Sequence, residues 1–83
     1  MKYMVVELLF TIKTAWVEND MICLLMSDGK EIRFPIEANK KLKNATETQR
    51  KKIEIICGGT GLHWPDLDED LSVTGIIEGR YGY

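Results

Sequence analysis

The chain has 83 residues, a formal net charge of −2, 45% hydrophobic residues and 29% charged residues. Chains divide into separate cores only well above this length, so residues 1–83 predict a single small domain. The composition is that of an ordinary folded protein and excludes disordered, collagen-like and coiled-coil chains. A domain of this size buries roughly 60–65% of its unfolded surface, which leaves little room for a large cofactor pocket. A small interaction or structural module without a cofactor is expected.

The cysteines and the apolar runs indicate the compartment. Cys23 and Cys57 lack the number and spacing of a secreted disulfide framework. Glu7 interrupts the apolar run of residues 1–10, which does not fit a signal peptide. The apolar run of residues 21–26 is far shorter than the ~20 residues of a membrane-spanning helix. We expect a soluble cytoplasmic protein that does not bind membranes.

The first half of the chain predicts a three-stranded antiparallel meander. Two β-rich runs lie within residues 11–26, and Asp28-Gly29 is a strong signal for a two-residue hairpin loop. Residues 31–36 then alternate between polar and apolar, as in a strand with one buried face. Pro35 indicates that this strand is at the edge of the sheet.

The loop lengths predict which residues face one another. A two-residue loop at Asp28-Gly29 places Cys23 opposite Phe34. A two-residue loop at residues 19–20 places Trp16 opposite Cys23. The expected core row of the meander is therefore Trp16, Cys23 and Phe34.

The second half predicts short helices and a β-hairpin. Residues 37–52 are rich in Lys and Asn and indicate two short helices, the second with a Thr46–Gln49 capping box. Residues 53–57 and 62–64 are expected to be strands joined by a glycine-rich turn. Alternation places Leu62 and Trp64 on one face of their strand and His63 on the other.

The last predicted element is a short C-terminal helix. Asp70 or Ser72 caps a helical turn over Val73 to Ile77, and Gly79 ends it. The complete expectation is an α+β domain: an antiparallel three-stranded meander, one or two short helices, a β-hairpin and a short C-terminal helix.

Several ligand motifs fail on their own spacing. The glycines of residues 58–61 lack the Gly-Lys-Ser/Thr of a phosphate loop. Residues 66–70 carry carboxylates at alternate positions, but a calcium loop of the EF-hand type would need glycine at Leu71 and glutamate at Ile77. A zinc site would need the only histidine, His63, together with two distant cysteines. No metal site is expected.

One enzymatic alternative stays open. Cys57 could approach His63 across the glycine-rich turn, with the acids of residues 66–70 nearby. No third orienting residue and no oxyanion site are evident for such a pair. A small core residue is the simpler role for Cys57, so we do not expect an enzyme.

A basic segment, residues 40–52, suggests a second alternative. It carries six cations against the single acid Glu47: Lys40, Lys41, Lys43, Arg50, Lys51 and Lys52. Such a patch could contact nucleic-acid phosphates, although it has no aromatic residue to stack on bases. A solvated helical surface is the favoured interpretation, and electrostatic pairing with acids elsewhere in the chain or in a second copy is a further alternative.

An acidic segment, residues 66–70, carries the main functional hypothesis. It places four acids within five residues, directly after a histidine and a tryptophan. Helix-dipole stabilisation accounts for only one or two of them. We therefore predict a partner-binding edge with a charged rim around a tryptophan anchor. Its residues are His63, Trp64, Asp66, Asp68, Glu69 and Asp70.

Two stretches resemble a known family. Residues 42–50 read LKNATETQR and residues 59–73 read GTGLHWPDLDEDLSV. Together with the Asp28-Gly29 hairpin they resemble the small bacterial family named domain of unknown function 2442. The resemblance covers nearly the whole chain, and Ile76-Ile77 departs from the leucine pair that the family has there.

The resemblance implies a small α+β bacterial domain without an established activity. Some relatives are encoded beside another short protein in pairs that resemble toxin–antitoxin modules, and some carry a helix-turn-helix extension. This chain ends at Tyr83, so we expect no such extension. The resemblance implies a protein partner encoded by a neighbouring gene, with this chain as the regulatory half of the pair; self-association is the other alternative.

Overall fold

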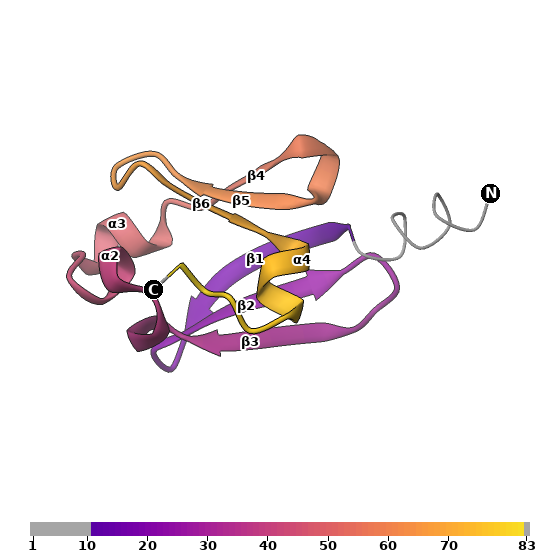
Figure 1. The fold of residues 1–83 in the computed structure, drawn as a ribbon, viewed down its shortest axis with the longest axis horizontal. Helices are drawn as coiled ribbons and strands as arrows, with labels where there is room; N and C mark the ends of the chain where they lie inside the picture. Colours follow the sequence, from indigo (N-terminus) through magenta and orange to yellow (C-terminus); the bar gives the residue numbers. More distant parts are fainter. Residues whose placement is uncertain (1–10, 83) are drawn as a thin grey trace.

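The computed structural model describes residues 11–82, which form two antiparallel sheets of three strands each (Figure 1). The first sheet contains β1 (Ile12–Glu18), β2 (Met21–Met26) and β3 (Glu31–Pro35), and the second contains β4 (Glu54–Ile56), β5 (Gly61–Trp64) and β6 (Glu69–Ser72). The helical elements are η1 (Ile36–Ala38), α2 (Lys40–Lys43), α3 (Glu47–Lys51), η2 (Cys57–Gly59) and α4 (Val73–Ile77). The predicted α+β class is confirmed, and the predicted elements occur in the predicted order, with one further strand, β6, before the C-terminal helix. The interrupted apolar run of residues 1–10 lies outside the described residues.

The first hairpin loop is as predicted. Asn19 and Asp20 form a two-residue loop with φ values of 51° and 61°, the backbone of a type I′ turn. Trp16 consequently lies opposite Cys23. Asn and Asp adopt positive φ more readily than most residues, which is why this loop could be placed from the sequence.

The second hairpin loop has three residues instead of two. The amide of Met26 donates to the Lys30 carbonyl (2.8 Å), and Gly29 adopts a φ of 91° at the third loop position. This is the three-residue loop in which a glycine forms a bulge. Phe34 therefore faces Ile22 instead of Cys23, so the predicted register of the second hairpin is wrong by one residue.

The register shift separates the expected core row. Because successive side chains alternate between faces, a one-residue shift moves Phe34 to the face opposite Cys23. Phe34 is fully buried between the two sheets, whereas Trp16 and Cys23 lie on the outer face of the first sheet. Cys23 nevertheless has no exposed surface, since it lies between Trp16 on β1 and Arg33 on β3. Burial raises the pKa of the Cys23 thiol.

Local capping signals place the helices correctly. The hydroxyl of Thr46 accepts from the Gln49 amide (3.2 Å) and the Gln49 side chain accepts from the Thr46 amide (2.9 Å), so the predicted capping box is confirmed. Ser72 caps α4 by accepting from the Gly75 amide at 3.0 Å. Asp70, the alternative cap, lies within β6 instead.

The third strand of the second sheet was not predicted. β6 pairs with β5, which places Leu71 opposite Leu62 and Glu69 opposite Trp64. Three of its four residues are polar, two of them acids with low strand propensity, so the local pattern hides the strand. Pairing with β5 and burial of Leu71 override that propensity.

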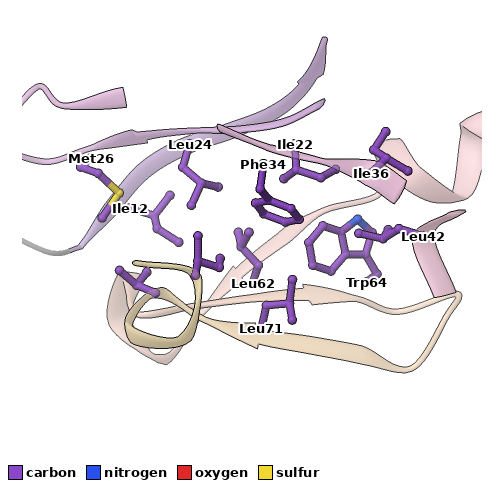
Figure 2. Packing of buried hydrophobic residues seen from close by; sticks show 12 residues of the cluster. Ile12, Ile22, Leu24, Met26, Phe34, Ile36, Leu42, Leu62, Trp64 and Leu71 are labelled. Atoms are coloured by element: carbon purple, nitrogen blue, oxygen red, sulfur yellow. The ribbon is translucent and has the colours of Figure 1, made fainter. Parts of the chain in front are cut away.

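Both sheets supply the core (Figure 2). Side chains of the first sheet meet those of the second, and Figure 2 shows Phe34 between Ile22, Leu62 and Trp64. The buried members of the core are Ile12, Ile22, Leu24, Met26, Phe34, Ile36, Leu42, Leu62, Trp64, Leu71, Val73 and Ile76.

Among residues 11–82, no helix is both long and apolar enough to cross a membrane.

Candidate functional site

An ionisable row crosses the outer face of the second sheet. His63 on β5 lies opposite Glu54 on β4 and opposite Asp70 on β6. The Nδ1 atom of His63 is paired with the Asp70 carboxylate, and the two side chains are 26% and 67% exposed. This hydrogen bond raises the pKa of His63, and the charges of Asp70, Glu54 and Asp68 raise it further while partial desolvation opposes them. His63 points away from the core, as predicted.

The turn between β5 and β6 carries two further exposed acids. The carboxylate of Asp66 pairs with Lys52 Nζ at 3.1 Å. Asp68 has a φ of 50°, a turn conformation that aspartate tolerates, and its carbonyl accepts from Lys41 Nζ at 2.9 Å. Both acids are exposed, so their carboxylates face solvent while contacts with lysines hold the turn in place.

Two of the six predicted partner-binding residues point inward. Trp64 is fully buried, and its Nε1 donates to the Arg50 carbonyl at 3.0 Å. Glu69 is half-buried and accepts from Asn39 Nδ2 at 2.7 Å. The predicted tryptophan anchor therefore supports the segment from below and does not itself form a contact surface. His63, Asp66, Asp68 and Asp70 remain accessible on the outside.

Three of the six cations of the basic segment form hydrogen bonds or ion pairs within the fold. Lys41 and Lys52 hold the acidic turn. Arg50 donates from Nε to the Leu42 carbonyl (2.7 Å) and from Nη2 to the Lys43 carbonyl (2.9 Å), which satisfies the C-terminal end of α2. The other three cations, Lys40, Lys43 and Lys51, are exposed. Lys52 is the cation of this segment that pairs with an acid among the described residues, and the three exposed lysines form a solvated helical surface.

The structure does not bring Cys57 and His63 together. Cys57 is exposed in η2 with a φ of 55°, three residues beyond the Glu54 that faces His63. Among residues 11–82, no hydrogen bond or ion pair joins Cys57 to His63, whose Nδ1 pairs with Asp70 instead. Within residues 11–82, no group of three or more His, Cys, Asp or Glu side chains could hold a metal ion.

Sequence reasoning missed three residues around the site. Glu54 extends the ionisable row, and the alternation of residues 53–57 was the signal that could have placed it opposite His63. Asn39 is fully buried and connects Glu69 to the carbonyl of Tyr81 (2.6 Å). The local signal at Asn39 is that of an N-cap for α2, and it does not reveal the contacts with Glu69 and Tyr81, which lie 30 and 42 positions away.

The fold recurs in solved structures of uncharacterised proteins. A crystal structure of a protein of unknown function from Rhodospirillum rubrum matches with a TM-score of 0.80 and 29% identity, covering 88% of this chain and 90% of that one. A solution structure of an uncharacterised protein from Chromobacterium violaceum matches with a TM-score of 0.76 and 28% identity, covering 88% of this chain and 69% of that one. No curated protein matches the chain.

The family comparison covers almost all of the described residues. The family described as Protein of unknown function (DUF2442) matches residues 12–82. The match includes both sheets, the helices between them, the ionisable row and the acidic segment. The chain therefore belongs to the DUF2442 family, as its sequence resemblance predicted.

Proposed function

We propose that this chain is a non-catalytic protein-binding module whose contact surface is the outer face of the second sheet together with the acidic turn. The observation that carries the proposal is the placement of three exposed carboxylates, those of Asp66, Asp68 and Asp70, on one short hairpin. Contacts with Lys41, Lys52 and His63 hold that hairpin in position. A pre-positioned charged rim loses little conformational freedom when it binds.

The chemistry of the surface favours a basic partner. The exposed acids would steer a patch of Lys or Arg into place and would suppress association with acidic surfaces. Glu54 extends the same charge across the sheet beyond His63. We propose as partner a protein encoded by a neighbouring gene, with this chain as the regulatory member of the pair.

The basic segment is the weaker candidate for a functional surface. Lys41, Arg50 and Lys52 already have partners within the fold, so binding of phosphates there would compete with contacts that hold the hairpin. The remaining cations provide few phosphate contacts, and affinity for nucleic acid scales with their number.

A charge-removal experiment tests the proposal. Asp66→Asn with Asp68→Asn removes two exposed charges, and the matched control Glu37→Gln with Glu47→Gln removes two exposed charges from η1 and α3. Isothermal titration with the product of the neighbouring gene measures affinity in each case. We expect the Asp66/Asp68 variant to bind at least about tenfold more weakly than the wild type, and the control to bind with unchanged affinity. The difference between the wild type and the Asp66/Asp68 variant should become smaller as the salt concentration rises.

Two results would contradict the proposed surface. Equal affinity of the wild type and the Asp66/Asp68 variant would show that the acidic turn does not contact the partner. Absence of binding by the folded wild-type protein would remove the neighbouring gene product as the partner. Thermal unfolding of both variants provides the check on folding, since exposed ion pairs contribute only about 0–1 kcal/mol.

A further inference from the structure

A strap of four residues, 79–82, closes one side of the space between the sheets. It runs back from α4 toward α2 (Figure 1). Its Tyr81 ring stacks on Phe34, with ring centroids 4.8 Å apart and an interplanar angle of 5°. Phe34 has no exposed surface, whereas Tyr81 is only half-buried. The strap is thus the outermost layer over an aromatic core residue.

A glycine turn directs the strap away from α4. Gly79 has a φ of 84°. Its amide donates to the Ile76 carbonyl (3.1 Å), and the Arg80 amide donates to the Gly75 carbonyl (2.7 Å). These two bonds form the Schellman motif that ends many helices. A Cβ on Gly79 would meet nothing within 4 Å, so this hinge has open space around it.

The surface that the strap covers, called the groove below, contacts the strap's backbone as well as its aromatic ring. Asn39 Nδ2 donates to the Tyr81 carbonyl (2.6 Å) and to Glu69 (2.7 Å), while Asn39 Oδ1 accepts from the Leu42 amide (2.9 Å). Gly82 lies so close that a Cβ there would be 2.5 Å from Asn39 Nδ2 and 2.8 Å from Glu69 Oε2. The strap thus places an aromatic residue followed by a tightly packed glycine against this surface.

The polar wall of the groove lowers the cost of opening it. Asn39 and Glu69 would be costly to uncover into an apolar space, but water can satisfy both groups when the strap leaves. Ala38 and residues 79–82 line an open hollow at the surface. The exposed Arg80 forms an ion pair with Glu78 at 2.6 Å on the surface.

We infer that the groove formed by Phe34, Asn39 and Glu69 is a peptide-binding site that the strap of this chain occupies in the closed state. Its ligand class is an extended peptide with an aromatic residue followed by glycine, and the strap defines that chemistry because it makes each of the contacts described above. Release of the strap opens the site to the same sequence in trans. This inference is independent of the proposed function, because it concerns the inward-facing groove and not the outer acidic surface.

The test uses full-length variants in which the strap is displaced. Gly82→Ala introduces a Cβ into the tight contact with Asn39 at a φ of 86°, and Tyr81→Ala removes only the stacking ring. The matched control is Gly29→Ala, which has the same backbone strain at a φ of 91° but open space around it. The probe is a fluorescein-labelled Gly-Arg-Tyr-Gly-Tyr peptide, the sequence of residues 79–83, measured by fluorescence anisotropy.

Both strap variants are expected to bind the probe, and the same peptide with alanine in place of its first tyrosine is expected not to bind. The wild type and Gly29→Ala should bind at least about tenfold more weakly, because apparent affinity falls with the fraction of molecules that are open. Failure of a folded strap variant to bind the probe would overturn the inference. Unfolding of both Gly82→Ala and Tyr81→Ala, checked by circular dichroism, would also overturn it by showing that the strap is an inseparable part of the core.

Discussion

The two sheets share one core but differ on their outer faces. The first sheet turns Trp16, Cys23 and Arg33 outward in one row, so a buried thiol lies between a ring and a guanidinium. The second sheet turns Glu54, His63 and Asp70 outward, and each of these side chains is ionisable. The inner faces must carry side chains that can be buried in the shared core, whereas the outer faces are under no such requirement and carry different residue types. The ionisable row of the second sheet is part of the contact surface that we propose.

The two tryptophans provide the largest test of this contrast. Trp64→Ala should destabilise the fold by about 3–5 kcal/mol, because it empties a fully buried site and leaves the Arg50 carbonyl without its donor. Trp16→Ala should cost about 1–2 kcal/mol, since a half-exposed ring has less buried surface to lose. Urea unfolding of both variants measures the difference. Equal losses would show that the outer face of the first sheet is as tightly packed as the core.

Alanine variants of two asparagines test how strongly Asn39 connects α2 to the second sheet. Asn39→Ala should cost about 2–3 kcal/mol, because its buried side chain joins the start of α2 to β6 and to the strap. Asn44→Ala is the matched control; Asn44 is exposed at the end of α2 and donates to the Lys40 carbonyl at 3.1 Å. We expect a loss within about 0.5 kcal/mol for that variant. Thermal unfolding that ranks the two variants equally would contradict the role assigned to Asn39.

The smallest effect is a pH response confined to the second sheet. The pKa of His63 is raised above 6.5 in the folded state, so its pairing with Asp70 stabilises the fold fully below pH 6.5. That contribution is lost as the pH rises through the folded pKa. Asp70→Asn should return the pKa of His63 toward 6.5, whereas Glu78→Gln, which removes the partner of Arg80, should not change it.

The titration is simple to read because the chain has one histidine. Proton NMR of the His63 ring gives the pKa directly in the wild type and in both variants. The stability difference between wild type and Asp70→Asn should also shrink from pH 6 to pH 9. An unchanged His63 pKa in Asp70→Asn would mean that Asp70 is not the group that holds the proton on the ring.

The comparison of the two hairpin loops of the first sheet shows how far local chemistry reaches. The loop at Asn19-Asp20 was placed correctly because two adjacent residues both tolerate positive φ. The loop at Asp28-Gly29 was placed one residue too short, because glycine suits both the two-residue and the three-residue loop. Only the packing of Phe34 against the second sheet selects between them.

The sequence by itself determined the features whose partners are close along the chain. These include the Thr46 capping box, the Ser72 cap and the outward direction of His63 between Leu62 and Trp64. Each depends on hydrogen bonds over three residues or on strict alternation, so a short window of residues contains the whole interaction.

Only the tertiary structure decided the features whose partners are distant. It made a strand of the acid-rich β6, turned Glu69 inward to Asn39, and placed Tyr81 on Phe34. It also divided the acidic segment into exposed carboxylates and one that is half-buried. The free energy of these contacts comes from burial and from polar groups satisfied across the fold, and neither is encoded in the propensity of the residues themselves.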